Sequence, residues 1–263
     1  RATGADLPFG DPLRAHGVAM EGYFMRVTDR QRNRVVIALI GVNRGPDGHW
    51  ATLGLASDEK PSSSSDPSAR PRSTLRLAEA PDGWADPDRI GARAGDQFEY
   101  RADGVRVDMG DGARLHLDVH DPVRWPHRAV GGSSMFQSVP ALNQYWHPWL
   151  LGGRARGWAE LEGERWEFDG AEVYGEKNWG AEGFPDSWWW GQAQAFSEPG
   201  TCVAFAGGQI HSGPLRTEVT AVVVRLPDGK VIRLGNPVVS PVRAEVSDER
   251  WEFEGLGYGW QVR

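Results

Sequence analysis

The segment from Tyr174 to Phe196 concentrates side chains of the kinds that line ligand sites. Its sequence, YGEKNWGAEGFPDSWWWGQAQAF, contains four tryptophans, a Glu-Lys pair, an Asn and two glutamines. Ligand pockets are lined mostly by apolar and aromatic side chains, with a few polar groups placed among them. The segment therefore predicts one wall of a binding pocket, and the alternative is an unusually aromatic core.

Strand alternation divides this segment into two faces, because alternate side chains of a β-strand point the same way. In the run SWWWGQAQAF, one face would carry Trp188, Trp190, Gln192 and Gln194. This mixture of indoles and amides predicts a ligand-binding face, although glutamines facing solvent beside tryptophans that cover a sheet edge would give the same pattern. The opposite face holds Trp189 and small residues, which suits close packing. By the same alternation, Glu176 and Lys177 point apart and are not expected to pair.

One histidine pattern has the spacing of a metal site. The run LHLDVHD puts His116, Asp118 and His120 on one face of a strand, and two His with one Asp can bind a metal. The outward polar face of a half-buried strand gives the same pattern. We favour that interpretation and predict no metal site.

His147 lies between two tryptophans, in the run QYWHPW. It is a candidate pocket acid or base because imidazole titrates near neutrality. The alternative is a hydrogen-bonded histidine in an aromatic turn. Cys202 lies in an apolar run and is expected to be chemically inert. The sequence contains no Gly-rich phosphate loop and no Gly-x-Ser-x-Gly elbow.

The elements that must carry these residues are predominantly β-strands. Turn residues separate short β-type runs every 8–12 residues or so, which predicts an all-β, antiparallel barrel or sandwich. LPDGKV at Leu226–Val231 predicts a hairpin turn, because Asp-Gly supplies the positive φ that tight turns need. No run has a sustained helical apolar period, so little helix is expected, with one short helix within residues 81–90. Residues 57–73 and 120–134 are expected to form loops.

A weak internal repeat indicates two related halves. RWEFDG at Arg165–Gly170 recurs as RWEFEG at Arg250–Gly255, and residues 18–42 and 186–207 share an order of aromatic strand, polar turn and apolar strand. Duplicated β halves would explain both features. Chance explains a match of this length equally well in a chain rich in Trp, Glu and Arg. The predicted halves are residues 1–150 and 151–263.

Composition limits the function classes. The chain has 263 residues, 40% of them hydrophobic and 25% charged, with a formal net charge of −7. This charge argues against nucleic acid or an anionic membrane as the main partner. No apolar run approaches the roughly 20 residues that span a bilayer. The single cysteine excludes an internal disulfide and favours a cytoplasmic location, either free or peripheral to a membrane.

Several segments together resemble the tocopherol cyclase family. YGEKNWGAEGFPDSWWWGQAQAF is similar to the family signature, a Glu-Lys-Asn-Trp-Gly run followed by Phe-Pro, a Trp-rich strand and a Gln. MEGYFMRVT near the start, GWAELEGERWEFDGAEV before the signature and CVAFAGGQI after it also resemble family segments. The resemblance implies an antiparallel β fold of two lipocalin-like halves packed together. Carotenoid hydratases and lipocalin-like pericyclases have related folds.

The resemblance also implies a reaction. The family closes a chromanol ring: an alkene of a prenylated hydroquinone is protonated, and the phenol oxygen captures the resulting cation. Such a cyclase, of the lyase or isomerase class, needs no cofactor and acts on a hydrophobic prenylated aromatic or polyene substrate. It needs a general acid, a dry pocket and aromatic faces, each of which attracts a desolvated cation by about 1–2 kcal/mol. Three alternatives stay open: a hydratase, a pericyclase and a non-catalytic isoprenoid carrier.

The resemblance and the strand pattern together give a set of candidate residues. The candidate catalytic acids are Glu176, Asp186 and Glu21, and their alternative roles are a salt bridge, a turn cap and an ion pair with an arginine, respectively. The candidate substrate-binding residues are Tyr23, Trp146, His147, Asn178, Trp179, Trp188, Trp190, Gln192 and Gln194. The amides would hold the phenol oxygens, or would instead satisfy buried backbone groups.

Overall fold

The computed structural model describes residues 18–60, 72–126 and 134–263. Within these ranges almost every element is a β-strand, and the helical structure amounts to one 3-10 turn, η2 (Met135–Ser138). The predicted all-β, antiparallel fold with little helix is confirmed. Of the two predicted loops, residues 61–71 and 127–133 lie outside the described residues.

The short helix expected within residues 81–90 is wrong. This segment contains the two-residue strand β5 (Trp84–Ala85), which pairs with β6 (Gly91–Ala94). Asp82 has a positive φ of 59°, which a right-handed helix excludes. Asp86 precedes Pro87, and a residue before proline is pushed toward extended backbone.

The chain forms two compact units that interleave along the sequence. Among the described residues, unit 2 comprises Ala19–Trp125 and Trp149–Lys177, and unit 1 comprises Val18, Pro126–Pro148 and Asn178–Arg263. These units differ from the predicted halves 1–150 and 151–263. The difference arises because β11 (Arg154–Leu161) pairs with β9 (Arg114–His120), and β12 (Glu164–Gly180) neighbours β1 (Met20–Asp29), so both later strands extend the earlier sheet. The duplication of two halves stays a prediction.

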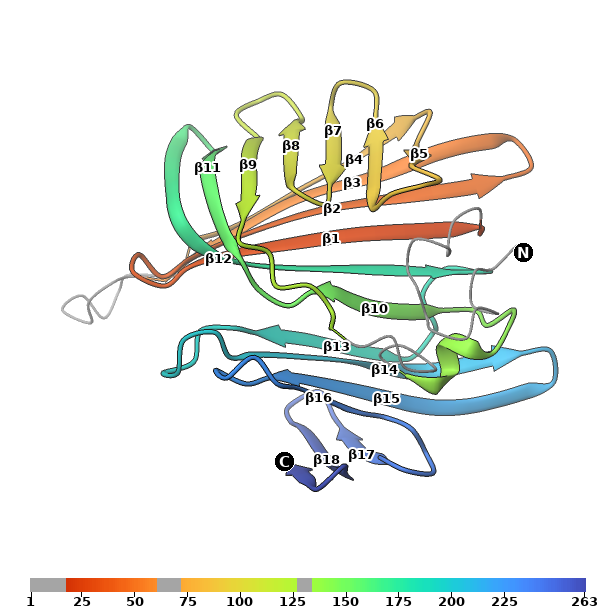
Figure 1. Ribbon diagram of the computed structural model, residues 1–263. Coiled ribbons are helices and arrows are strands. Elements are labelled where there is room, and N and C mark those ends of the chain that lie inside the picture. Colours follow the sequence, from red (N-terminus) through yellow and green to blue (C-terminus); the bar gives the residue numbers. More distant parts are fainter. Residues whose placement is uncertain (1–17, 61–71, 127–133) are drawn as a thin grey trace. The chain divides into compact units, whose positions relative to one another are not determined.

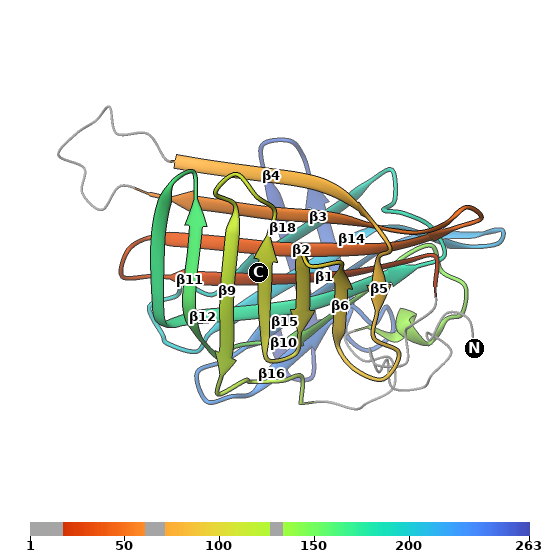
Figure 2. The same ribbon diagram turned by 90° about the horizontal axis from the view of Figure 1, so that it is seen from above.

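The strands of unit 2 belong to one curled sheet. Its order is β4-β3-β2-β1-β12-β11-β9-β8-β7-β6-β5, and β10 (Tyr145–Leu150) pairs with β12. The remaining strands are β2 (Arg34–Gly45), β3 (Gly48–Glu59), β4 (Arg72–Pro81), β7 (Phe98–Arg101) and β8 (Gly104–Asp108). Both views show β5–β9 crossing over the long strands β1–β4 (Figures 1 and 2), and β6 packs over β2 and β5 over β3.

The core of unit 2 lies on the inner face of this curled sheet. β1 shows why: buried and half-buried residues alternate along it, so that Tyr23, Met25 and Val27 point inward. They join buried residues from both layers, including Ile40 from β2 and Phe98 from β7. Lipocalin-like sheets enclose their interior in this way, with inward and outward side chains alternating along each strand.

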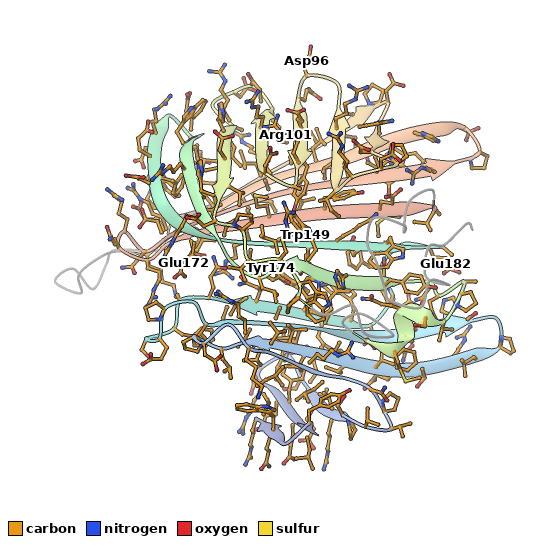
Figure 3. The ribbon with its side chains drawn as sticks, viewed as in Figure 1. Asp96, Arg101, Trp149, Glu172, Tyr174 and Glu182 are labelled. Carbon is orange, nitrogen blue, oxygen red and sulfur yellow. The ribbon has the colours of Figure 1, made fainter. Side chains whose placement is uncertain are left out.

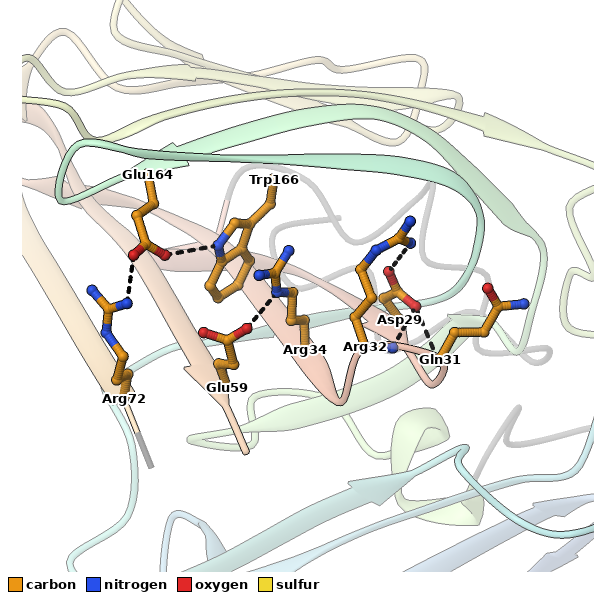
Figure 4. A network of polar contacts seen from close by, with 8 residues as sticks. All are labelled: Asp29, Gln31, Arg32, Arg34, Glu59, Arg72, Glu164 and Trp166. Carbon is orange, nitrogen blue, oxygen red and sulfur yellow. Dashed lines mark hydrogen bonds and ion pairs between the residues drawn. The ribbon is translucent and has the colours of Figure 1, made fainter. Parts of the chain in front are cut away.

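A row of polar contacts links the start of β12 to the ends of β2–β4 (Figure 4). The Arg34 guanidinium donates to Glu59 at 2.7 Å, and it also lies over the Trp166 ring, 4.7 Å from its centroid. Glu164 accepts from Arg72 and from the Trp166 indole. The hydrogen bond from Arg72 holds the pKa of the Glu164 carboxyl below its usual range. The Arg34–Glu59 pair is half-buried and the Arg72–Glu164 pair is exposed, and ion pairs near the surface add about 1 kcal/mol or less to stability.

Unit 1 contains two smaller sheets. The four-stranded sheet has the order β13 (Trp188–Ala193), β14 (Cys202–Ser212), β15 (Leu215–Arg225) and β16 (Val231–Leu234). The three-stranded sheet contains β17 (Val242–Val246), β18 (Trp251–Gly257) and β19 (Trp260–Val262). The two sheets meet where the ring centroids of Phe205 and Phe253 lie 4.4 Å apart. The predicted turn at Leu226–Val231 connects β15 to β16, and Gly229 has the required positive φ of 86°.

No helix among the described residues is long and apolar enough to cross a membrane. Cys202 is a buried cysteine on β14. The two copies of the internal repeat both lie in strands, RWEFDG in β12 and RWEFEG in β18.

The buried tyrosines of unit 2 predict a loss of stability in alkaline solution. Burial, followed by the charge of Glu21, raises the pKa of Tyr23 well above its usual value, and burial raises that of Tyr100. Above pH 10 or so, an unfolded chain releases these protons while the folded chain keeps them. The free energy of unfolding therefore falls by about 1.4 kcal/mol per pH unit for each tyrosine. Urea unfolding at pH 9 and pH 11 measures this slope.

The matched variants are Tyr100→Phe, which removes one buried phenol, and Tyr258→Phe, which removes an exposed one. We expect Tyr100→Phe to reduce the alkaline slope and Tyr258→Phe to leave it as in the wild type. Equal slopes in the wild type and in Tyr100→Phe would contradict the assignment.

Candidate active site

Residues 174–180, the first part of the signature segment, form the end of β12, and side chains are buried on both faces of the strand there. Tyr174, Glu176 and Lys177 are each at most 3% exposed. Tyr174 and Glu172 are labelled along this strand in Figure 3. Gly175 allows the close packing of its inner face: a Cβ there would lie 3.1 Å from the Tyr100 hydroxyl and 3.3 Å from the Trp149 ring. A larger residue at this position would displace Tyr100.

On the inner face of β12, Lys177 belongs to a buried charge cluster with β1 and β2. The Lys177 ammonium donates to Glu21 at 2.9 Å, and neither side chain has any solvent exposure. Arg44 reaches the other oxygen of Glu21 at 2.7 Å. The Tyr23 hydroxyl also donates to Glu21, at 3.1 Å, while Lys177 lies over the Tyr23 ring, 5.1 Å from its centroid. Two cations therefore share one carboxylate inside the unit.

Glu176 lies on the opposite face of β12 and has a different environment. It is 3% exposed, and its Oε2 accepts a hydrogen bond of 2.6 Å from the Tyr174 hydroxyl. The ring of Tyr174 meets Phe24 of β1 edge to face, with the ring centroids 6.5 Å apart. The prediction that Glu176 and Lys177 do not pair with each other agrees with these partners. Glu21 therefore binds two cations and a phenol, and Glu176 accepts a buried hydrogen bond from the phenol of Tyr174.

The Trp-rich segment forms β13 in unit 1, and its tryptophans differ in exposure. Trp189 is buried and donates to Thr220, whereas Trp188 is 50% exposed. Gly191 faces Phe205 so closely that a Cβ would lie 2.4 Å from its ring. The face predicted for close packing is thus packed at Trp189 and Gly191.

The predicted ligand-binding face of β13 includes side chains that contact one another. Trp190 and Gln192 are half-buried, and Gln194 is buried just beyond the strand. The Gln192 amide donates to Gln194 at 3.1 Å and contacts the Cys202 sulfur at 3.6 Å. The role of this face in binding a substrate stays a prediction.

A second aromatic group of unit 1 surrounds Trp179. Its ring is buried and stacks on Tyr145, with the centroids 5.4 Å apart and the planes inclined by 16°. Asn178 and Trp146 are half-buried. His147 is buried, and burial lowers its pKa to about 3. Burial therefore favours the neutral imidazole near pH 7.

Asp186 lines a cavity of about 390 Å³ in unit 1. The walls are the loop Glu182–Asp186, the end of β14 and the start of β15. His211 lies on the wall and is 3.4 Å from Glu182, while the Asn143 side chain accepts a hydrogen bond from the His211 backbone. Phe184 is on the rim, 5.0 Å from the exposed Trp188 ring. The cavity has the size of a small-molecule site, and Asp186 is solvent-exposed within it.

The structure brings Glu21 and Tyr23 into contact in unit 2 and places Glu176 on the other face of β12. It places the other predicted residues in unit 1, where Asp186 lines the cavity. The ion pair with an arginine that was the alternative role for Glu21 is present as Glu21–Arg44. Sequence reasoning did not identify Lys177 as a partner of Glu21 or Tyr174 as a partner of Glu176. The alternation of side chains along the strand separates Lys177 from Glu176. Only the pairing of β1 with β2 shows which arginine lies near Glu21.

The histidine pattern on β9 lies at the surface of the strand. His116 is 3.8 Å from Asp118, and both side chains are exposed. Among the described residues, no group of three or more His, Cys, Asp and Glu side chains could hold a metal ion.

We expect removal of the Glu21 carboxylate to lower the free energy of unfolding substantially. The variant Glu21→Gln leaves Lys177 and Arg44 without their shared carboxylate, and breaking a buried pair of this kind costs about 3–5 kcal/mol. Glu59→Gln is the matched control, because it breaks a half-buried pair with Arg34, worth about 1 kcal/mol or less. Chemical unfolding at pH 7 measures both. Equal losses would show that the Glu21 cluster is no more important than a surface pair.

We expect the buried imidazole of His147 to lower the free energy of unfolding in acid. Its pKa is about 3 in the folded chain, against 6.5 for an ordinary imidazole, so below pH 6.5 only the unfolded chain takes up this proton. The free energy of unfolding should fall by about 1.4 kcal/mol per pH unit from this group alone. His147→Gln should flatten the dependence between pH 7 and pH 5, while His49→Gln, at an exposed site, should not. Parallel curves for wild type and His147→Gln would contradict this account.

Known proteins resemble the chain in sequence and in fold. A family model described as tocopherol cyclase-like matches residues 106–263. The probable chloroplastic tocopherol cyclase of Oryza sativa subsp. japonica is 46% identical over 73 residues, which is 27% of this chain and 15% of that protein. The chloroplastic tocopherol cyclase of Zea mays is 44% identical over 59 residues, 22% of this chain and 12% of that protein. These alignments cover less than a fifth of either relative.

The fold has a solved counterpart. The crystal structure of a putative AttH from Nitrosomonas europaea superposes with a TM-score of 0.52 at 14% identity, over 92% of this chain and 78% of that chain. At this identity the likeness concerns the fold alone. The family match covers more than half of the chain and includes the buried signature strand of Glu176 and Lys177. The chain therefore belongs to the tocopherol cyclase-like family.

Proposed function

We propose that the protein is a cyclase that protonates an alkene of a hydrophobic prenylated aromatic substrate and closes a ring through the phenol oxygen. The observation that carries this proposal is the buried carboxyl of Glu176 inside the segment that matches the family. A buried carboxyl group that is hydrogen-bonded to a phenol is suited to deliver a proton, because burial disfavours the ionised carboxylate. We assign Glu176 as the general acid.

The environment of Glu21 argues against the same role for that residue. Lys177 and Arg44 both approach its carboxylate within hydrogen-bonding distance, at 2.9 Å and 2.7 Å. Two adjacent cations favour the ionised form of a carboxyl group. We therefore assign Glu21 to the framework of unit 2, where it pairs with the buried Lys177 and the half-buried Arg44.

Asp186 is the other candidate acid, and it is exposed at the cavity of unit 1. Water at such a position would compete with the phenol oxygen for a carbocation, and ring closure depends on excluding it. We therefore place Asp186 second to Glu176.

A set of aromatic and amide side chains in unit 1 is proposed for substrate binding. Trp179, Trp188 and Trp190 are proposed to contact the prenyl chain, since ligand pockets are lined mostly by apolar and aromatic side chains. The amides of Asn178, Gln192 and Gln194 are proposed to hold the phenol oxygens. The reaction is an isomerisation: a C–H bond and a C–O bond form, the phenol O–H bond and the alkene π bond break, and the phenol proton balances the one that Glu176 donates. No cofactor is needed for this balance.

Replacement of Glu176 tests the proposal, with a geranyl-substituted hydroquinone as the probe. Glu176→Gln should lower the rate of ring closure by about a hundredfold or more, the usual contribution of a general acid, while the protein stays folded. Glu167→Gln removes an exposed carboxylate from the same strand and should retain the wild-type rate. Product formation is followed by chromatography and mass spectrometry, and folding by circular dichroism.

The other outcomes assign the alternatives. A wild-type rate in folded Glu176→Gln with a loss in Asp186→Asn would move the acid to Asp186. A product heavier by one water molecule would identify a hydratase. Ring closure that survives both substitutions would favour a pericyclic reaction, and a probe recovered unchanged from a bound complex would identify a carrier.

A further inference from the structure

Two turns of unit 1 expose apolar side chains at one end of its three-stranded sheet. The first turn, residues 236–240, connects β16 to β17, and the second connects β18 to β19. Val238 and Val239 in the first turn are 83% and 52% exposed, and Leu256 and Tyr258 at the second are 64% and 59% exposed. Scattered exposed apolar residues are ordinary, but a group of them on adjoining turns marks an interaction surface. We call these four residues the apolar tip.

The two turns of the apolar tip lie against each other. The Leu256 backbone N–H donates to the Pro241 carbonyl oxygen at 3.3 Å. A Cβ at Gly257 would lie 3.1 Å from the Val239 carbonyl oxygen and 2.9 Å from the Ser240 Cα, so glycine at this position permits the close approach. The four exposed side chains therefore share one end of the unit and can enter one medium together.

The first turn is held by its own hydrogen bonds. The Asn236 side-chain oxygen accepts from the backbone N–H groups of Val238 at 3.0 Å and Val239 at 3.4 Å. The Ser240 N–H donates to the Asn236 carbonyl oxygen at 2.9 Å. This is an Asx turn, in which a side-chain oxygen replaces a backbone acceptor. Its backbone donors are thus satisfied internally, as a segment that enters an apolar medium requires.

Tyr258 occupies a backbone position that suits small polar residues. Its φ is +53°, and that of Gly259 is +79°, which together make the two positive φ values of a type I′ hairpin turn. Asn, Asp and Gly adopt these values readily, whereas a bulky residue is strained there. The ring is exposed, so packing within the fold does not explain the tyrosine. Strained residues are concentrated at functional sites.

Composition points to a lipid surface. Neither residues 235–242 nor residues 255–262 contain a charged side chain, in a chain of which 25% is charged. Trp260 follows the second turn, and the Lys230 ammonium lies 4.5 Å from the centroid of its ring. Tyrosine, tryptophan and lysine side chains of this kind are typical of the boundary between headgroups and acyl chains. The net charge of −7 disfavours anionic lipids and favours zwitterionic ones.

A second copy of the chain is a poorer partner for the apolar tip. Stable protein–protein interfaces use roughly 20–30 residues from each side. The two turns offer residues 236–240 and 256–260, which are too few for such an interface. A bilayer needs no matching surface, because burial of apolar area alone drives the contact.

We propose that the apolar tip docks the protein on the surface of a zwitterionic lipid bilayer, with its four side chains between the headgroups and the upper acyl chains. A prenylated aromatic substrate partitions into bilayers, so docking would bring the enzyme to its substrate. That benefit rests on the proposed function, whereas the docking uses none of the residues assigned to the reaction.

Sedimentation of the full chain with sucrose-loaded phosphatidylcholine vesicles, in the absence of substrate, tests the proposal. The wild type should sediment with the vesicles. Leu256→Ser and the double variant Val238→Ser with Val239→Ser should each bind about tenfold more weakly, because each removes apolar surface that the bilayer buries. Raising the salt from about 0.1 M to about 1 M, which screens charges, should leave binding unchanged.

Leu77→Ser is the matched control, because Leu77 on β4 of unit 2 is 64% exposed, as is Leu256. It should bind vesicles like the wild type. Equal losses in Leu77→Ser and Leu256→Ser would overturn the proposal, because any exposed leucine would then serve.

Tyr258→Asn separates docking from folding. Asparagine suits the positive φ of this position, so the unfolding temperature should stay the same or rise, while vesicle binding falls severalfold. A lower unfolding temperature with unchanged vesicle binding would assign Tyr258 to the fold and contradict its place in the apolar tip.

The remaining outcomes also decide. A wild-type chain that stays in the supernatant overturns the proposal, and so does binding that high salt abolishes, since charge would then drive it. Self-association that the tip variants lose, without vesicle binding, would make a second copy the partner. Glu176→Gln should bind vesicles like the wild type. Ring closure without vesicle binding would refute docking alone, and vesicle binding without ring closure would refute the proposed reaction alone.

Discussion

The buried cluster of Lys177, Glu21 and Arg44 is the interaction on which the structure of unit 2 depends. An ion without solvent exposure must be compensated by a partner at short range, and here Glu21 and Lys177 compensate each other while the half-buried Arg44 binds the second carboxylate oxygen. The cluster joins β12 to β1, which is its neighbour in the sheet but far from it in the sequence, and to β2, which lies on the other side of β1. It therefore specifies which strands come together and in which register, more than it adds to net stability.

That register determines where the proposed acid lies. Adjacent residues of a strand point to opposite faces, so anchoring Lys177 on the inner face of β12 directs Glu176 to the outer face. The signature thus places residues with different environments next to each other: Lys177 binds Glu21, and Glu176, the proposed acid, accepts a hydrogen bond from Tyr174. Gly175 belongs to the same arrangement, because its missing side chain leaves room for Tyr100 beneath the strand.

Sequence reasoning predicted the fold class well because strand length, turn residues and missing helical periodicity are local properties. It anticipated the hairpin turn at Leu226–Val231 and the separation of Glu176 from Lys177 for the same reason. It failed at residues 81–90, where a positive φ at Asp82 and a proline override a helical appearance. It also could not show that β11 and β12 extend the earlier sheet, or that Lys177 and Arg44 share Glu21, since both depend on pairings between distant strands. The low pKa of His147 depends on burial, which its aromatic neighbours only suggested.

The most direct test of the central claim, ring closure by proton donation, is to run the reaction of the geranyl-substituted hydroquinone in deuterium oxide. Mass spectrometry and NMR would then locate any deuterium in the purified product. The account predicts a chromanol with one non-exchangeable deuterium on the carbon that receives the proton, adjacent to the new C–O carbon. A chromanol without deuterium at that carbon would contradict it, because the ring would then have closed without an acid.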